Sequence, residues 1–189
     1  IIYEYTNKMY IARQDLRQIR RIIVADYRET VDYILGIPLF AQKIGKENLS
    51  SLLCRLGNPE KAIPAVHVAG TNGKGSTCRA LAQMLTGMGY RVGLFTSPHL
   101  VSINERIQID GENISDADFV WAFETVKEKF TQHPSFFEVM FAMAAVYFRE
   151  KKCDFVVYET GMGGRLDATN VLMPELSIIT SVGMDHMEY

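Results

Sequence analysis

The sequence predicts an α/β domain built on a doubly wound, mostly parallel sheet. Short runs rich in β-branched residues, such as AVHVAG, RVGLFTS and DFVVYE, have the length and composition of buried strands. Segments with helical spacing of their apolar residues lie between these runs. Strands that alternate with helices are typical of parallel sheets covered by helices on both faces. Ligands of such sheets bind at the carboxyl ends of the strands.

Composition excludes several classes of protein. The 189 residues are 48% hydrophobic and 22% charged, which excludes a disordered chain, a collagen-like repeat and a disulfide scaffold. Twenty basic and 22 acidic side chains give a net charge of -2, so we expect no nucleic-acid partner and no anionic membrane partner. The apolar runs are far shorter than the ~20 residues that span a bilayer. Three widely spaced cysteines form no CxxC pair, so we expect reduced thiols and a cytoplasmic protein.

The amino-terminal half contains one βαβ unit. Residues 1–26 match no motif, and we interpret them as an atypical extension whose basic run is a solvated face. Apolar spacing predicts a short helix over 26–35, then a loop, and a second helix over 47–57 that ends at a glycine. Strand, glycine loop, helix and strand follow one another over 65–97, which predicts parallel strands joined by a right-handed crossover.

The carboxyl-terminal half continues the alternation. RIQID is interpreted as a short strand, and Ser115 begins a helix that extends to about Phe130. Ser135 and Glu138 form a capping box in front of FFEVMFAMAAVYF, which is apolar all round and predicts a helix packed on both sides. DFVVYE and LSIITSV are the last two predicted strands.

The glycine-rich segment over 70–77, GTNGKGST, lies between a predicted strand and a predicted helix. Glycines allow backbone N–H groups to turn toward phosphate oxygens, and the helix N-terminus adds a favourable partial charge. Lys74 supplies a cation, and Ser76 can supply a hydroxyl. The spacing departs from the usual phosphate loop, because only two residues separate Gly70 from the Gly-Lys pair and Gly75 follows the lysine. The alternative is a glycine-rich turn with an incidental lysine.

Polar side chains follow several other predicted strands. Ser97 follows the strand RVGLF, Glu159 ends DFVVYE, and His186 lies just beyond LSIITSV. Parallel strands end at one edge of a sheet, so we expect these side chains to lie beside Lys74. A carboxylate at this position suits Mg²⁺, which takes one or two protein oxygens together with phosphate oxygens and water.

Four motifs, HVAGTNGKGST, LFTSPHLVSINERIQIDG, ETGMGGRLDATN and SVGMDHMEY, occur in this order. Together they resemble the folylpolyglutamate synthase family, which includes bifunctional dihydrofolate synthases and belongs to the Mur ligase superfamily. The resemblance covers residues 27–189 and implies a Mur-ligase-type ATP-binding domain that is truncated at its C-terminus. Family members are about twice this length or more. We therefore expect the glutamate-binding C-terminal domain and a carbamylated lysine to lie outside this chain, and the chain alone to be inactive.

The resemblance also implies the site residues. The residues implied in ATP binding are Thr71, Asn72, Gly73, Lys74, Gly75 and Ser76. Two Mg²⁺ ions would be held by Ser97, Glu159 and His186, and the implied catalytic residues are Lys74, Glu159 and His186. The pterin-bearing substrate would lie near three segments, whose residues are Gly36, Ile37, Pro38, Leu39, Ser135, Phe136, Phe137, Glu138, Leu166, Asp167 and Ala168. Some have structural alternatives: a capping box explains Ser135 and Glu138, and Asp167 could cap Thr169 or Asn170.

The implied activity is that of a monomeric, ATP-dependent ligase that joins L-glutamate to a folate through an acyl phosphate. Dihydrofolate synthase, which joins glutamate to dihydropteroate, shares the same motifs, and one enzyme can perform both reactions. A cell-wall Mur ligase is a further alternative, but FFE and GRLDATN favour the folate branch. Outside enzymes, a nucleotide-binding module with a phosphate loop and no ligase activity remains open.

Overall fold

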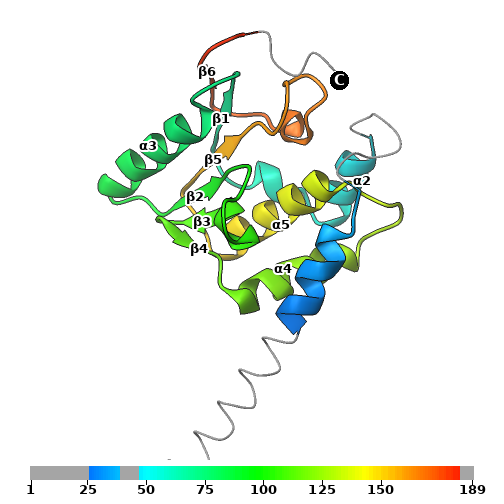
Figure 1. The fold of residues 1–189 in the computed structure, drawn as a ribbon. Helices are drawn as coiled ribbons and strands as arrows, with labels where there is room; N and C mark the ends of the chain where they lie inside the picture. The colour runs from blue at the N-terminus through cyan, green and yellow to red at the C-terminus, as the bar shows by residue number, and fades with distance from the viewer. Residues whose placement is uncertain (1–25, 39–46, 184–189) are drawn as a thin grey trace, which may run out of the picture.

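A six-stranded sheet organises the protein, in a computed structural model that describes residues 26–38 and 47–183. The strand order is β4-β3-β2-β5-β1-β6 (Figure 1). The strands are β1 (Ala65–Ala69), β2 (Val92–Phe95), β3 (Ile107–Ile109), β4 (Glu112–Asn113), β5 (Phe155–Glu159) and β6 (Leu176–Ile179).

The register of the sheet brings the strand ends together. Strand β5 pairs in parallel with β1 and β2, and β1 also pairs in parallel with β6. The carboxyl ends of these four strands therefore lie at one edge of the sheet. Strands β3 and β4 form an antiparallel hairpin beside β2. The predicted mostly parallel sheet is confirmed, whereas the short strand β4 and the antiparallel direction of β3 were not predicted.

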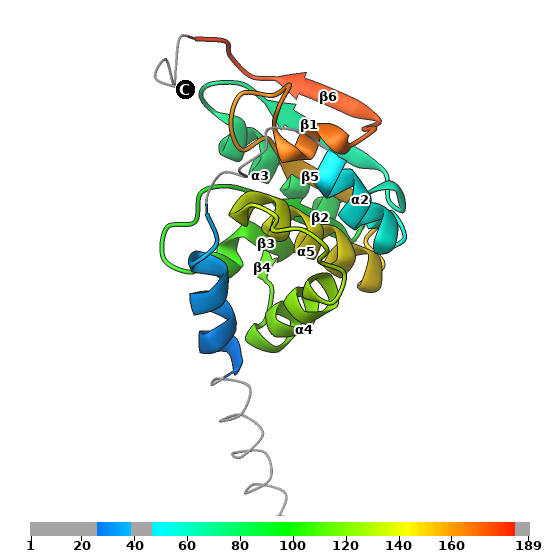
Figure 2. The ribbon, with the colours of Figure 1, turned by 90° about the vertical axis from the view of Figure 1, so that its right-hand side faces the viewer.

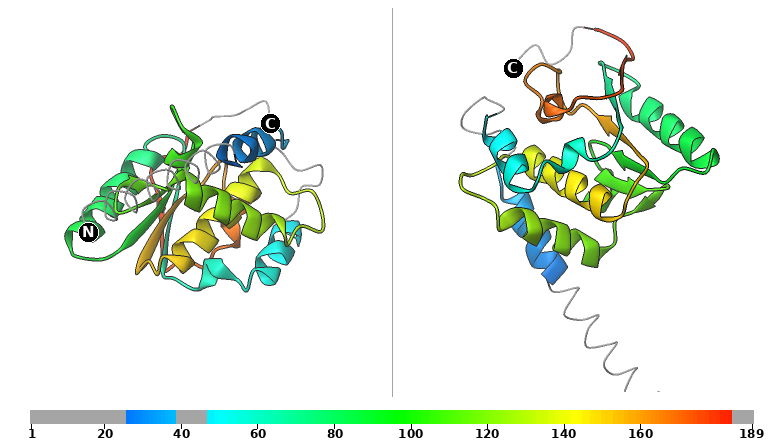
Figure 3. Two further views of the ribbon diagram at one scale, coloured as in Figure 1. Left: turned by 90° about the horizontal axis from the view of Figure 1, so that it is seen from below. Right: turned by 180° about the vertical axis from the view of Figure 1, so that it is seen from behind.

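Helices cover both faces of the sheet, as a doubly wound fold requires. Helix α3 (Lys74–Gly87) packs on one face, and α2 (Glu47–Arg55), α4 (Asp116–Lys127) and α5 (Phe136–Glu150) lie on the other (Figure 3, left). Each face has its own apolar core. The smaller core, under α3, includes Val68, Cys78, Leu94 and Val157. In the part of the chain that the structure describes, no helix is long and apolar enough to cross a membrane.

Helix α5 is the centre of the larger core, as its apolar sequence predicts. Twelve of its 15 residues are buried, because it lies between the sheet and the helix α4. Its Phe141 ring lies 5.3 Å from the Tyr158 ring of β5, centroid to centroid. A Cβ atom at Gly93 of β2 would lie 2.7 Å from the Phe148 ring, so only glycine admits this close contact.

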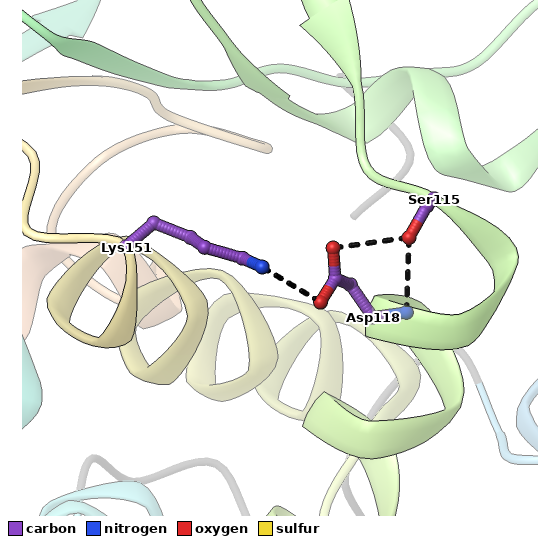
Figure 4. Close-up of polar contacts among 3 residues, drawn as sticks. All are labelled: Ser115, Asp118 and Lys151. Carbon is purple, nitrogen blue, oxygen red and sulfur yellow. Dashed lines mark hydrogen bonds and ion pairs between the residues drawn. The ribbon is translucent and has the colours of Figure 1, made fainter.

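The start of α4 is fixed by a small polar cluster (Figure 4). The Ser115 hydroxyl accepts a 3.1 Å hydrogen bond from the Asp118 N–H and donates a 3.0 Å bond to Asp118 Oδ2. Lys151, which follows α5, donates a 2.8 Å bond to Asp118 Oδ1. The predicted cap therefore also joins α4 to the end of α5.

The helix over 26–35 packs against α4 (Figure 2). The Tyr27 and Phe119 rings are 5.7 Å apart, and the Tyr33 and Phe123 rings are 5.4 Å apart. Ile34 is fully buried in the larger core. This helix precedes Gly36–Pro38, one of the predicted substrate segments, and the packing holds that segment against the domain.

Candidate functional site

The glycine-rich loop joins β1 to α3, as predicted. Gly70 has a φ of 136°, and a Cβ atom there would lie 2.2 Å from Thr180 Oγ1. Gly73 caps α3 with a φ of 81°, a left-handed conformation that favours glycine. Both glycines are therefore required by the path of the backbone, which turns sharply into the helix.

The segment that follows β6 holds this loop from the other side. The Thr71 N–H donates to Ser181 O at 2.8 Å, and the Asn72 N–H donates to Ser181 Oγ at 3.1 Å. The Thr180 hydroxyl donates to Asn72 O at 2.7 Å. Sequence reasoning missed Thr180 and Ser181, because both fall inside the predicted strand LSIITSV, whereas β6 ends at Ile179. Because these bonds occupy the N–H groups of Thr71 and Asn72, an anion would have to bind further along the loop.

The N–H groups at the start of α3 are free to bind such an anion. The first backbone bond of the helix runs from Thr77 N to Gly73 O. In the described residues no hydrogen bond occupies the backbone N–H groups of Lys74, Gly75 or Ser76. Unpaired N–H groups and the helix dipole together favour negative charge at this position.

Lys74 lies over the same loop. Its Nζ donates to Gly70 O at 2.8 Å and to Thr71 O at 3.3 Å. The ammonium group therefore rests on loop carbonyls and forms no ion pair with a described carboxylate. A phosphate at the loop would offer this cation a stronger, charge-assisted hydrogen bond than a carbonyl does.

Glu159 and Ser97 meet beside the loop. Strand β5 presents Glu159 at its carboxyl end, and the carboxyl oxygens lie 3.5 Å from the Cβ position of Gly75. The Ser97 N–H donates a 2.9 Å hydrogen bond to Glu159 Oε2. The structure therefore brings Lys74, Ser97 and Glu159 to one edge of the sheet, whereas His186 lies outside the described residues.

The donors of Glu159 and Ser97 fit a divalent cation. Glu159 is buried, and its Oε1 accepts no hydrogen bond from the described residues. The Ser97 hydroxyl also has no hydrogen-bond partner among them. Both are hard oxygen ligands of the kind that Mg²⁺ binds alongside phosphate and water. Across the described part of the chain, no cluster of three or more histidine, cysteine or acidic residues forms a complete protein cage for a metal.

Opposing effects act on the charge of Glu159. Burial raises the pKa of this carboxyl above its ordinary value. The hydrogen bond from Ser97 lowers the pKa, as do the charges of Lys74, Arg79 and Arg106. A bound cation would act in the same direction as these charges and favour the carboxylate.

The three predicted substrate segments lie close together. Pro38 O accepts a 3.0 Å hydrogen bond from Phe136 N, which joins the segment after the first described helix to the start of α5. A Cβ atom at Gly161 would lie 2.6 Å from Phe137 Cζ, so the loop after β5 contacts the same helix end. Leu39 lies outside the described residues.

Structural roles explain several residues of these segments. Ser135 and Glu138 form the predicted capping box, with Glu138 Oε2 accepting bonds of 2.7 Å from Ser135 N and 2.9 Å from Ser135 Oγ. Asp167 caps the turn over Ala168–Val171, because its Oδ1 accepts from Thr169 N at 2.9 Å. Its Oδ2 accepts from Met162 N at 2.8 Å. Leu166 is 71% exposed and is thus available to a ligand without rearrangement.

His67, which sequence reasoning missed, ties this loop to the sheet. Its Nε2 lies 2.8 Å from Thr169 Oγ1 and 2.9 Å from Thr160 Oγ1. The Thr169 hydroxyl donates its proton to Asp167 Oδ1, so the imidazole must donate to Thr169. Burial lowers the pKa of His67, and the charge of Asp167 raises it. The strand β1 thereby supports the loop that carries Leu166–Ala168.

Comparison with known proteins agrees with this geometry. Residues 68–189 match the Mur ligase middle domain. The chain is 47% identical over 169 residues to the dihydrofolate synthase/folylpolyglutamate synthase of Bacillus subtilis, covering 85% of this chain and 39% of that protein. It thus spans about two fifths of the length of this curated relative.

Solved structures of folylpolyglutamate synthases are also similar to this chain. The Mycobacterium tuberculosis folylpolyglutamate synthase complexed with ADP is 35% identical and superimposes with a TM-score of 0.82, over 88% of this chain and 39% of that chain. A folylpolyglutamate synthase complex with AMPPCP and folate is 40% identical, also with a TM-score of 0.82, over 86% of this chain and 42% of that chain. With its mostly parallel sheet, its glycine loop and this match over most of its length, the chain belongs to the Mur ligase family and carries the family's middle domain.

Proposed function

We propose that the protein containing this chain is an ATP-dependent ligase that joins L-glutamate to a folate. The observation that carries the proposal is the convergence of Lys74, Ser97 and Glu159 at the strand ends, next to three linked segments that could receive the pterin. The relatives support the substrate class, because one solved structure is a folylpolyglutamate synthase complex with AMPPCP and folate.

The reaction requires activation of a poor electrophile. An oxygen of the substrate carboxylate would attack the γ-phosphorus of ATP, and the bond to ADP would break with its electrons leaving on ADP. The amine of glutamate would then attack the acyl carbon, lose a proton to solvent and expel inorganic phosphate. The task of the protein is positioning and stabilisation of charge, and a nucleophilic side chain is not needed.

The residues of this chain divide that task. The free N–H groups of Lys74, Gly75 and Ser76 would bind the phosphate oxygens, with the Lys74 ammonium moving from the loop carbonyls onto the β- and γ-phosphates. Ser97 and Glu159 would hold Mg²⁺ on the side of the γ-phosphate, and we propose His186 as a ligand of a second ion. When bound, Mg²⁺ neutralises charge on the transferring phosphoryl group.

A second activity, the addition of glutamate to dihydropteroate, is favoured by one observation. The Bacillus subtilis relative, at 47% identity, carries both dihydrofolate synthase and folylpolyglutamate synthase in its name. We propose that the two substrates would use the same site, because they share the pterin and a reacting carboxylate.

We further propose a cytoplasmic monomer in which residues 27–189 form the ATP-binding domain and glutamate binds outside them. All three cysteines of the chain are free thiols, which favours a reducing compartment.

The proposal is tested by measuring glutamate incorporation and ADP release with the protein expressed from its complete reading frame. We expect ADP release to require both glutamate and either tetrahydrofolate or dihydropteroate. The Lys74→Ala variant, prepared in parallel, controls for enzymes of the expression host. ADP release that is indifferent to both substrates would support a nucleotide-binding module without ligase activity and contradict the proposal.

A further inference from the structure

Arg106 is a buried cation that the reaction described above does not use. Arg106 is the last residue of the short turn Ile103–Arg106, which precedes β3. The residue as a whole is only 8% exposed. The Thr96 N–H donates to Arg106 O at 3.0 Å, which fixes the backbone beside the end of β2. Burying an unpaired charge is costly, so a buried arginine is normally paired with an anion.

No described carboxylate pairs with this guanidinium. Among the described residues, Arg106 forms a single side-chain hydrogen bond, from Nε to His99 Nδ1 at 2.8 Å, and no salt bridge. His99 cannot neutralise the charge, because the imidazole accepts the hydrogen bond at Nδ1 and carries no negative charge. The neighbouring Glu105 carboxylate instead accepts bonds from the N–H groups of Leu100, Val101 and Ser102.

The two amino groups of the guanidinium are open to a ligand. They have no hydrogen-bond partner in the described residues, and yet they are not sealed inside the protein. Among the described residues, only Glu60 Oε2 is a side-chain nitrogen or oxygen atom that is both completely buried and without a hydrogen-bond partner. The unpartnered amino nitrogens of Arg106 are thus not completely buried. The amino groups of Arg106 therefore reach solvent, although most of the side chain is buried.

Arg106 lies between the two halves of the candidate site. Its Cζ is 5.1 Å from the centroid of the Phe136 ring, in the predicted substrate segment. On the other side its backbone carbonyl accepts the Thr96 N–H, and Thr96 directly precedes Ser97, which is bonded to Glu159. Arg106 is therefore placed within reach of an anion that approaches Ser97 and Glu159 from the Phe136 side.

We propose that Arg106 is a further substrate-binding residue, whose two amino groups hold the reacting carboxylate of the folate. This assignment rests on the proposed function. With Nε engaged by His99, the pair of amino groups still presents parallel N–H donors, which match the two oxygens of a carboxylate. The stacked Phe136 ring and the bond to His99 hold the fork in a fixed orientation, which reduces the entropy lost when substrate binds.

The test compares two ligands that differ in charge at similar size. Folate and its diamide, in which both side-chain carboxylates are amides, are titrated calorimetrically into the protein from the complete reading frame, with Mg²⁺ and AMPPCP present. We expect Arg106→Gln to weaken folate binding by roughly 10- to 100-fold, the usual effect of losing hydrogen bonds to a charged group, with the affinity for the diamide unchanged. Retained affinity for the diamide and for AMPPCP also shows that the variant is folded.

Arg79→Gln is the matched control. Arg79 is exposed, and its charge also lowers the pKa of Glu159, so the control removes a nearby cation without removing the proposed contact. We expect this variant to keep the preference for folate. Should Arg106→Gln not fold, Arg106→Lys provides the same comparison, because one ammonium group cannot replace the paired donors.

Each outcome decides a specific point. An unchanged preference for folate in the Arg106 variant overturns the assignment. Weaker AMPPCP binding with unchanged folate binding also overturns it, because Arg106 would then hold a phosphate. Failure of the unaltered protein to bind folate at all would instead contradict the proposed function.

Discussion

The Ser97 N–H donates a 2.9 Å hydrogen bond to Glu159 Oε2, and this bond joins the ends of two neighbouring parallel strands. It fixes one oxygen of a buried carboxylate and leaves Oε1 without a partner among the described residues. Gly75 leaves the space that this carboxylate occupies next to α3. The fold itself therefore holds the glycine-rich loop next to the candidate metal ligand.

Replacing Glu159 by glutamine should raise the Mg²⁺ requirement or eliminate activity. The amide keeps the size of the side chain but loses the negative charge that a divalent ion needs. We expect at least about a tenfold increase in the Mg²⁺ concentration for half-maximal activity, since losing even an outer hydrogen-bond partner of a metal ligand costs roughly 10- to 100-fold in affinity. Glu60→Gln is a matched control, because Glu60 is equally buried but lies outside the site. Identical Mg²⁺ titration curves for Glu159→Gln and the parent would make Glu159 a structural residue.

Replacing Lys74 by alanine should reduce kcat by on the order of 100- to 1,000-fold, the effect of removing one preorganised donor to developing charge. In the described part of the chain no other cation rests on the loop carbonyls of Gly70 and Thr71. Steady-state kinetics with ATP as the varied substrate measure the effect, and Lys61→Ala, a mostly exposed lysine, provides the comparison. An unchanged kcat and KM for ATP in Lys74→Ala would refute the assignment of the phosphate loop.

Ser115→Ala should destabilise the 189-residue chain by about 1 kcal/mol. The change removes the acceptor for the Asp118 N–H and one contact of the Asp118 carboxylate, as at other helix N-caps. Urea unfolding followed by the fluorescence of Trp121, the sole tryptophan of the chain, reports directly on α4. Ser51→Ala, at an exposed helix position, should change the free energy of unfolding by less than about 0.5 kcal/mol. Equal effects of the two variants would show that the cap contributes nothing.

Stability should fall on acidification because of His67. Burial lowers the pKa of the folded imidazole, so between that value and the ordinary value of 6.5 the unfolded chain binds more protons. The contribution of neutral His67 to the free energy of unfolding is complete above pH 6.5. It is lost as the pH falls through the pKa of the folded protein. The free energy of unfolding, measured from pH 7.5 to 5, should therefore decrease less for His67→Gln than for the parent. Parallel curves for the two proteins would contradict a neutral, partly buried His67.

Much of the fold could be predicted because it depends on local pattern. Alternating strands and helices predicted the parallel sheet, and the serines at 115 and 135 marked the starts of α4 and α5. The antiparallel direction of β3 could not be predicted, because strand polarity depends on the partner and not on the composition of IQI. The two-residue strand β4 is too short to have a periodic pattern.

The candidate site was predictable only where a residue carries its own chemical signal. Lys74 follows β1 through the glycine-rich loop and Glu159 ends β5, and the parallel pairing of these two strands then brings them together. The hydrogen bond from the Asn72 N–H to Ser181 Oγ joins the glycine-rich loop to a residue 109 positions away, a pairing that depends on the fold and not on local sequence pattern. Arg106 follows a glutamate in a polar stretch, so only the fold shows that it is buried.

The most direct test of the account is the fate of an oxygen atom of the substrate carboxylate. Folate labelled with ¹⁸O in its side-chain carboxylates is incubated with ATP, Mg²⁺, glutamate and the protein from its complete reading frame, and the released phosphate is analysed by mass spectrometry. Attack of the carboxylate on the γ-phosphorus transfers one labelled oxygen to inorganic phosphate in each turnover, which is the result we expect. Phosphate released without label, while glutamate is still incorporated, would contradict carboxylate activation at the site formed by Lys74, Ser97 and Glu159.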